Sequence, residues 1–211
     1  MAVLTNTQIL EKIKAGSLSF TPPLDAFQLH SHSVDLRLGF TFMIPKQWTL
    51  TPKGRESISL DYIGNNRRNN FEVIELEKGQ YFEILPEEYI LVSTLESLKM
   101  PNDIMCVLFP RSSTNRRGLS VDLTGIVDAG YEGPLTIPIR NNTKSQTIRL
   151  YPGERFCQLV FQDLNNKVEP RQSKYHKKDV IEGYIAEQDM TETEFIAKGD
   201  ITGLKKFSPQ A

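Results

Sequence analysis

Residues that could do chemistry gather between positions 110 and 133, in the stretch PRSSTNRRGLSVDLTGIVDAGYEG. Arg111 carries a planar fork of donors that suits a phosphate group. Ser112 and Ser113 can cap a short helix whose exposed N–H groups attract anions, and Gly118 is suited to ending that helix. The pattern predicts a phosphate-binding turn.

The second half of this stretch, TGIVDAGYEG, places one acid and one aromatic residue, Asp128 and Tyr131, between apolar runs. We expect a hairpin here, because Gly125, Gly130 and Gly133 let the backbone approach a ligand or adopt a positive φ. An ordinary Gly-rich hairpin with Asp128 as a turn former is the alternative. The residues by themselves support these two interpretations equally.

Two further segments carry charged or polar residues that a simple barrel does not require. In HSVDLRLG, Asp35 and Arg37 are two residues apart and share one strand face, so they could brace each other. A buried or cross-strand structural ion pair is at least as well supported as contact with a ligand. In YPGERFCQLVF, a turn at Pro152–Gly153 precedes a strand that Arg155 and Gln158 interrupt.

Short strands must position these residues. Helical periodicity of useful length is missing between residues 35 and 165, so a βαβ sheet is not expected. The pattern predicts a mainly β fold, an antiparallel barrel or jelly roll. The predicted strands are VDLRLGFTFMI, YFEIL, YILVSTL, IMCVLF, LTIPI, TIRLY and FCQLVFQDL.

The two ends of the chain differ from this central part. A short amphipathic helix is predicted in TNTQILEKIKAG, where Ile9, Leu10 and Ile13 have helical spacing and Gly16 is a suitable stop. After residue 165 the chain is strongly polar, which indicates a tail that packs over the rest or stays mobile. The predicted organisation is a helix and linker over residues 1–23, a β-barrel domain over 24–165 and a tail over 166–211 that could act as a lid.

Bulk properties limit the partners. The 211 residues, 39% of them hydrophobic, suit one globular domain with appended segments. A net charge of −1 argues against a nucleic-acid polymer or an anionic membrane as partner, so any nucleotide partner should be small. Without an apolar run long enough for a membrane span or a signal peptide, we expect a cytoplasmic protein.

Metal and disulfide chemistry are not indicated. The two cysteines, Cys106 and Cys157, lie inside apolar runs where a thiol usually behaves as a small buried hydrophobe. The three histidines are too scattered to suggest a metal cluster.

Taken in order, the four polar segments resemble the conserved motifs of the dUTPase and dCTP deaminase superfamily. SVDLRLG resembles the first motif, PRSS with Arg116 and Gly118 the second, GIVDAGYEG the third and GERFCQL the fourth. LPEEYILVSTLESLKMPNDI and a later SKY at residues 173–175 resemble the dCTP deaminase branch. The resemblance covers about residues 24–176, and it implies a distorted jelly-roll barrel, a homotrimer and active sites at subunit interfaces.

The resemblance also bears on which reaction is catalysed. Deaminases of this superfamily resemble one another in a proton-shuttling Glu shortly after the third motif, and in this chain that position is Pro138. A proline cannot transfer protons, and neither Thr136 nor Asn141 replaces a carboxylate. Glu132 lies six residues earlier, at a turn. The leading hypothesis is therefore a dUTP diphosphatase, which hydrolyses dUTP to dUMP and pyrophosphate.

For that reaction the resemblance implies a role for each residue. Asp128 would activate the attacking water, Tyr131 would pack under the deoxyribose, and main-chain groups of the hairpin that starts at Gly125 would read the uracil. Mg²⁺ would be held through the substrate triphosphate rather than by the protein. Phosphate contacts would come from Arg111, Ser112, Ser113, Arg116, Gln158 and, in the tail, Lys174 and Tyr175, with Asp35 and Arg37 as structural support.

Two alternatives remain open. The first is a dCTP deaminase, alone or bifunctional with dUTPase activity. The second is a regulatory protein that binds a deoxynucleotide without turning it over.

Overall fold

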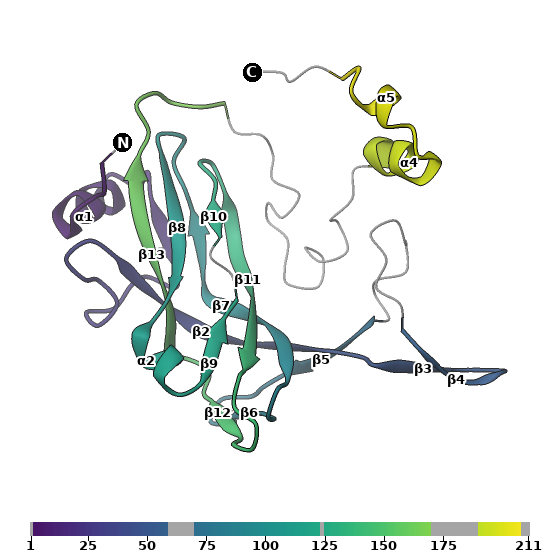
Figure 1. The fold of residues 1–211 in the computed structure, drawn as a ribbon. Coiled ribbons are helices and arrows are strands. Elements are labelled where there is room, and N and C mark those ends of the chain that lie inside the picture. The colour runs from purple at the N-terminus through teal and green to yellow at the C-terminus, as the bar shows by residue number, and fades with distance from the viewer. Residues whose placement is uncertain (1, 59–69, 123–124, 170–189, 208–211) are drawn as a thin grey trace.

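The computed structural model describes residues 2–58, 70–122, 125–169 and 190–207 of the chain. It is mainly β, with a curled antiparallel sheet and a short N-terminal helix, so the predicted fold class is confirmed (Figure 1). In the part of the chain that is described, no helix is long and apolar enough to cross a bilayer.

The main sheet has nine strands. Seven of them follow the order β10-β8-β13-β2-β7-β11-β9, while β1 pairs with β7 and β5 pairs with β2. The bounds are β1 (Ser19–Thr21), β2 (Val34–Pro45), β5 (Phe71–Glu75), β7 (Tyr89–Lys99), β8 (Ile104–Pro110), β9 (Leu119–Val121), β10 (Ile126–Val127), β11 (Glu132–Asn141) and β13 (Arg155–Asp163).

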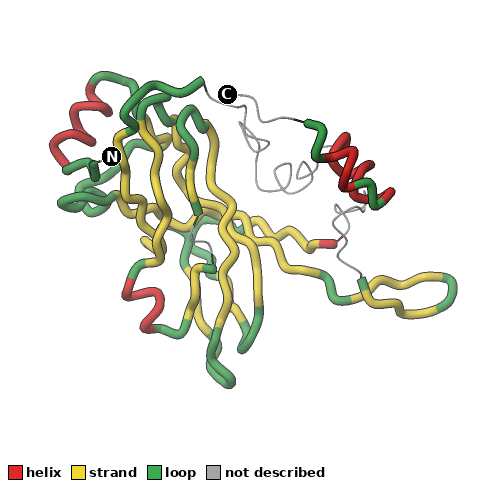
Figure 2. The backbone as a smooth tube through the Cα atoms, turned by 45° about the horizontal axis from the view of Figure 1, so that its top comes forward, coloured by secondary structure: helices red, strands yellow, loops and turns green. Residues whose placement is uncertain are grey.

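Two small two-stranded sheets accompany the main sheet. One joins β6 (Phe82–Ile84) to β12 (Ile148–Leu150), and the other joins β3 (Trp48–Thr51) to β4 (Gly54–Ser57). Both views show the β3–β4 pair extending away from the main sheet (Figures 1 and 2).

The core follows the alternation of side chains along the strands. In β8, Ile104, Cys106 and Leu108 are fully buried and alternate with more exposed neighbours, as expected for a strand with one face on the core. Cys157 of β13 is also fully buried, and burial raises the pKa of both thiols. These cysteines therefore behave as small core residues, in agreement with the prediction.

The N-terminal helix α1 (Asn6–Lys14) begins with a capping box between Thr5 and Gln8. Ile9 is fully buried, while Leu10 is 40% exposed, so the buried face is narrower than the spacing suggested. Gly16, at φ +71°, follows the end of the helix in the left-handed conformation that glycine favours.

The described part of the C-terminal segment is largely helical. Two short helices, α4 (Met190–Lys198) and α5 (Ile201–Leu204), pack together, and the rings of Phe195 and Phe207 lie 5.6 Å apart. Asp200 accepts a hydrogen bond from the Gly203 N–H and so caps α5. The prediction missed these helices because a local cap and a few apolar residues are weak signals in a polar segment.

Candidate active site

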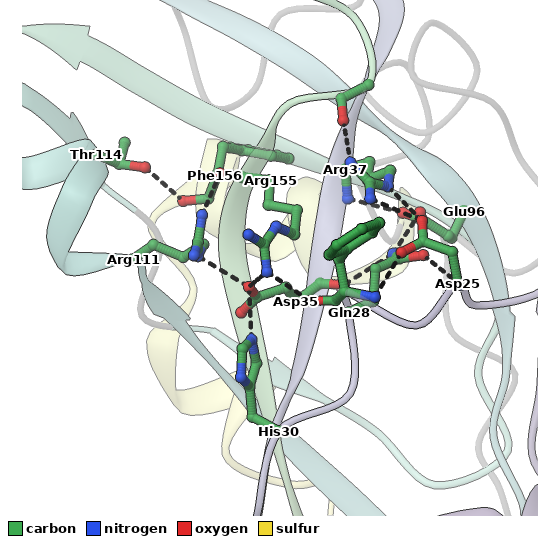
Figure 3. A network of polar contacts seen from close by, with 12 residues as sticks. Asp25, Gln28, His30, Asp35, Arg37, Glu96, Arg111, Thr114, Arg155 and Phe156 are labelled. Carbon is green, nitrogen blue, oxygen red and sulfur yellow. Dashed lines mark hydrogen bonds and ion pairs between the residues drawn. The ribbon is translucent and has the colours of Figure 1, made fainter.

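One buried carboxylate, that of Asp35, is the centre of the polar site in Figure 3. Arg111 Nε lies 2.9 Å from Asp35 Oδ2, and Arg155 Nη1 lies 3.2 Å from the same oxygen. His30 Nε2 is 3.0 Å away. We call these four residues the Asp35 cluster.

The strand order brings the cluster together. Because β13 lies between β8 and β2, Gln158 pairs with Asp35 on one side, and Cys157 pairs with Pro110 at the end of β8 on the other. Arg111 follows Pro110 directly. Three of the four polar segments found in the sequence therefore meet at one edge of the sheet.

Two guanidinium groups face one carboxylate, so one positive charge in the cluster is left unbalanced. The Asp35 side chain is 1% exposed, whereas those of Arg111 and Arg155 are 24% and 27% exposed. The buried acid holds both arginines in place while part of each remains accessible to solvent. This arrangement suits the binding of an anion with several oxygens, such as a polyphosphate.

The turn after β8 forms the short helix α2 (Ser112–Arg116), but its predicted capping is wrong. The N-cap residue is Arg111, which makes no side-chain capping bond, and Ser112 and Ser113 lie in the first turn with exposed side chains. Their hydroxyls can therefore face a ligand rather than the helix end. Thr114 anchors the helix instead, because its hydroxyl donates to the Phe156 carbonyl at 3.1 Å.

Arg116, Gly118 and Gln158 lie around the same end of the strands. Arg116 is exposed in the last turn of α2, and Gly118 follows the helix at φ +85°. Gln158 Nε2 lies 3.4 Å from the Pro110 carbonyl, a long hydrogen bond that ties β13 to the start of the turn.

Asp35 and Arg37 do not brace each other. Arg37 donates through Nε to Asp25 Oδ2 at 2.9 Å and through Nη1 to the Gly153 carbonyl. Asp35 instead takes its cations from β13 and from the end of β8. Two charged residues on one strand face can pair with each other. Here each of them pairs instead with a residue of a neighbouring segment.

The expected hairpin around Asp128 is also absent. β10 pairs with β8, whereas β11 pairs with β7 and β9, so the strands flanking Asp128 and Tyr131 do not pair with each other. A turn joins them, closed by the Tyr131 N–H donating to the Asp128 carbonyl at 3.2 Å. Gly130 adopts φ +77° and its N–H donates to the Pro101 carbonyl at 3.1 Å.

Asp128 and Tyr131 have opposite environments. Asp128 is exposed, while Tyr131 is 8% exposed and packs in the main core. The Tyr131 hydroxyl donates to the Pro134 carbonyl, and burial raises the pKa of this phenol to about 12. Tyr131 is therefore a neutral, fixed ring at ordinary pH, with only a small edge open to a ligand.

The Asp128 turn and the Asp35 cluster are far apart within one chain. Val127 pairs with Cys106 near the start of β8, whereas Arg111 follows its far end. Asp128, the residue after Val127, is level with Met105, and the six residues from Met105 to Arg111 span about 20 Å at about 3.4 Å per residue. The turn after β10 and helix α2 accordingly lie at opposite ends of β8 (Figure 1).

The predicted tail contacts Lys174 and Tyr175 lie outside the described residues. Within the described ranges, no group of three or more His, Cys, Asp or Glu side chains could hold a metal ion.

Sequence reasoning missed three partners in this region: Asp25, Gln28 and Glu96. Gln28 is 1% exposed and donates to the Asp35 carbonyl at 2.9 Å and to Glu96 Oε1 at 2.7 Å. Glu96 did carry a signal, because it has the same strand parity as the buried Val92 and Leu98. A charged residue at a core position of a strand indicates a satisfied polar site.

Comparison with known proteins gives a consistent result. A family profile described as dCTP deaminase-like matches residues 3–164. A Methanobrevibacter smithii protein named "dCTP deaminase, dUMP-forming" is 35% identical over 187 residues, which cover 84% of this chain and 91% of the relative. A Sulfurihydrogenibium protein of the same name is 34% identical over 174 residues and covers 82% and 91%.

A solved structure agrees in fold. The 2'-deoxycytidine 5'-triphosphate deaminase from Agrobacterium tumefaciens superposes with a TM-score of 0.59 at 24% identity. The match covers 76% of this chain and 48% of that one, so this chain spans about half the length of that protein.

These relatives contradict the predicted dUTP diphosphatase. Proteins between 32% and 37% identical to this chain carry the name "dCTP deaminase, dUMP-forming". The prediction gave decisive weight to Pro138. One position along a strand is a weak guide to chemistry, because a proton-transfer group is defined by its place in space and a neighbouring strand can supply it.

Proposed function

Since this chain belongs to the dCTP deaminase-like family, we propose that it converts dCTP and two waters to dUMP, ammonia and pyrophosphate. The observation that carries the proposal is the Asp35 cluster, in which a buried acid holds Arg111 and Arg155 with one positive charge unbalanced. A triphosphate supplies the charge and the oxygen atoms that such a pair recognises.

In this proposal, the phosphates bind along the edge formed by α2 and β13. Arg111, Ser112 and Ser113 contact them, with Gln158 and Arg116 at the margins. The arginines offset charge that develops on the leaving pyrophosphate. Mg²⁺, whose preferred ligands are oxygens, would be carried by the triphosphate and would neutralise part of its charge; the described residues offer no cage of their own.

Asp128 is the proposed base for hydrolysis at the α-phosphorus. Its exposed carboxylate can orient a water and accept its proton, and the neutral ring edge of Tyr131 lies beside it in the same turn. The separation of about 20 Å from Arg111 prevents both residues from serving one substrate within a single chain. We therefore propose that the site forms between subunits of a homotrimer, with Asp128 from one chain and the Asp35 cluster from another.

Deamination needs a proton-transfer group near the cytosine ring, and we propose Asp122 for this role. Val121 pairs with Ile139, and the Asp122 N–H donates to the Pro138 carbonyl at 3.0 Å, so Asp122 lies directly opposite Pro138. Directly opposed residues point to the same face of a sheet, with Cβ atoms about 5 Å apart. Asp122 is exposed and so places a carboxylate beside the position that the superfamily resemblance assigns to a Glu.

A product assay tests the proposed function. Purified protein is incubated with Mg²⁺ and either dCTP or dUTP, and nucleotides, ammonia and pyrophosphate are measured in the same samples. From dCTP we expect dUMP, ammonia and pyrophosphate in equal amounts. Turnover of dUTP without any ammonia from dCTP would rule out the deamination half, and unchanged dCTP and dUTP would rule out both halves.

The variant Asp122→Asn separates the two halves. We expect ammonia release from dCTP to fall by about 100-fold or more, because the amide cannot shuttle a proton. Pyrophosphate release from added dUTP should stay close to that of the wild type. Asp163→Asn, which changes an exposed acid at the end of β13, is the matched control and should alter neither rate. Normal ammonia release by Asp122→Asn would exclude Asp122 from the reaction.

A further inference from the structure

Glu96 is a buried acid for which the proposed reaction has no direct use. It lies near the end of β7, is 1% exposed, and receives hydrogen bonds on both oxygens. Gln28 Nε2 donates to Oε1 at 2.7 Å, and the Arg37 backbone N–H donates to Oε2 at 2.9 Å.

Burying a carboxylate is costly, and that cost has to be offset by what the group holds in place. Burial raises the pKa of Glu96, and the hydrogen bonds from Arg37 and Gln28 oppose that rise. The position has core parity, so an apolar residue would fill it without the desolvation cost. The contacts of the carboxylate therefore indicate its role.

The first contact is to β2. Leu38 pairs with Thr94, but the register between β2 and β7 then shifts before Phe42. The Arg37 N–H lies next to this irregular part of the ladder, and the Glu96 carboxylate accepts its hydrogen bond. Glu96 thereby fixes the β2 backbone two residues after Asp35.

The second contact is to the segment of residues 25–30. Gln28 is bound to Asp35 twice, since its carbonyl accepts from the Asp35 N–H at 2.8 Å and its side chain donates to the Asp35 carbonyl at 2.9 Å. Glu96 fixes the other hydrogen of the same side-chain amide. One carboxylate thus holds both the strand that carries Asp35 and the segment that lies against it.

The same segment contacts the cluster itself. The Phe27 carbonyl accepts from Arg155 Nη1, and His30 Nε2 lies 3.0 Å from Asp35 Oδ2. Displacing residues 25–30 would therefore change the direction of one guanidinium and one neighbour of the central carboxylate. Figure 3 shows Glu96, Gln28 and Asp35 in this succession.

We propose that Glu96 is a positioning residue for the phosphate-binding cluster, acting through Gln28 and the β2 backbone to hold Asp35 and Arg155 in their binding geometry. This inference rests on the proposed function, in which the cluster binds the substrate triphosphate. Glu96 itself touches no substrate.

The test measures binding of inorganic triphosphate by calorimetry, together with KM and kcat for dCTP. In Glu96→Gln, the new amide nitrogen would face either Gln28 Nε2 or the Arg37 N–H. Both of these groups are donors, so one of the two hydrogen bonds is lost. We expect triphosphate affinity to fall about tenfold, the size expected for one lost hydrogen bond, with KM rising by a similar factor and kcat changing less.

Glu88→Gln is the matched control. Glu88 precedes β7, at the opposite end of the strand from Glu96, and its carboxylate also accepts a backbone hydrogen bond, from Leu85 at 2.7 Å. It does not contact the Asp35 cluster, so triphosphate affinity and KM should stay at wild-type values.

A double-mutant cycle distinguishes positioning from a general loss of stability. Gln28→Met should also weaken triphosphate binding, and adding Glu96→Gln to it should cost less affinity than Glu96→Gln costs alone. The two substitutions share the Glu96–Gln28 hydrogen bond, while the contact of Glu96 with the Arg37 N–H is separate. Simple additivity, or unchanged affinity in folded Glu96→Gln, would overturn the proposal. If Glu96→Gln does not fold, unchanged affinity in Gln28→Met overturns it instead.

The outcomes also separate this inference from the function on which it rests. If wild-type protein binds no triphosphate, the proposed phosphate site is wrong. If the wild type binds and the variants bind equally well, only the role of Glu96 is wrong.

Discussion

At the scale of single residues, the proposed site contains two aspartates in opposite environments. Asp35 is buried and pairs with two arginines, whereas Asp128 is exposed. The same side chain thus has a structural role in one place and a proposed chemical role in the other. Burial and partners make this difference, since both residues are acids in polar motifs of the sequence.

The structural role of Asp35 predicts a large loss of stability in Asp35→Asn. Removing the charge leaves two partly buried arginines without their counterion, which should lower the free energy of unfolding by about 3 to 5 kcal/mol. Chemical denaturation provides the measurement. Asp25→Asn is the control, because Asp25 pairs with Arg37 at a side chain that is 43% exposed, and its change should stay within about 1 kcal/mol. Equal effects would contradict the distinction drawn between the two acids.

Tyr131 yields a prediction about pH. Its pKa is raised from 10 to about 12 by burial, so its contribution to stability is complete below pH 10 and is lost as the pH rises through 12. Relative to Tyr131→Phe, the wild type should be about 1 kcal/mol more stable at pH 8, owing to the hydrogen bond to Pro134. That advantage should shrink above pH 10 in denaturation curves. A constant difference up to pH 11.5 would show that the phenol is not buried as described.

At the scale of elements, the order β8-β13-β2 matters most for the site. It places the end of β8 and the start of β13 beside Asp35, and α2 then carries the serines along the same edge. The helix has only five residues, so its position depends on its ends rather than on its length. Gly118, which follows the C-cap residue Arg117, lies at one such end.

Gly118→Ala is predicted to destabilise the protein more than an alanine at another left-handed glycine. A Cβ at Gly118 would lie 2.5 Å from Thr143 Cγ2, and the Thr143 hydroxyl is held by Asn141 and Gln146. Gly79, at φ +89°, has no atom within 4 Å of its Cβ position and should show only the backbone cost of about 1 to 2 kcal/mol.

The neighbour of Gly118 provides a direct check. Thr143→Ser removes the methyl group that the new Cβ would meet. Thermal and chemical denaturation of Gly118→Ala/Thr143→Ser should therefore show the smaller cost seen for Gly79→Ala. A double variant as unstable as Gly118→Ala alone would mean that the close contact is not the cause.

At the scale of the whole molecule, the proposed site is incomplete in one chain. About 20 Å of strand β8 separates the Asp128 turn from Arg111, and the curled sheet holds them at opposite ends. In the proposed homotrimer, association between copies brings them to one substrate. The oligomer is then part of the catalytic machinery rather than a means of added stability.

Subunit complementation tests this proposal. Asp128→Asn and Arg111→Gln should each be inactive as homo-oligomers. The first lacks the carboxylate proposed to activate water, and the second lacks a proposed phosphate contact. Subunits mixed after dissociation and reassembled should regain activity, because some interfaces then combine an intact Asp128 with an intact Arg111. Each variant reassembled with itself is the control. No recovery in verified mixed oligomers would place both residues in sites that are complete within one chain.

Local patterns in the sequence were sufficient for the mainly β class, the N-terminal helix and the buried cysteines. Period-two alternation, caps and turn residues involve only a few neighbouring positions. They can therefore be recognised from the sequence alone. The same applies to the chemical character of residues such as Arg111 and Asp128. The family resemblance likewise lies in the four motifs of the sequence itself.

Long-range register was needed for the rest. The partners of Asp35, the separate pairing of Arg37 with Asp25, and the position of Asp122 opposite Pro138 all depend on which strands become neighbours. A shift of one residue between two strands changes every facing pair. The local sequence pattern does not determine which register is adopted. The packing of the complete sheet selects one register, and that register determines which charged residues meet.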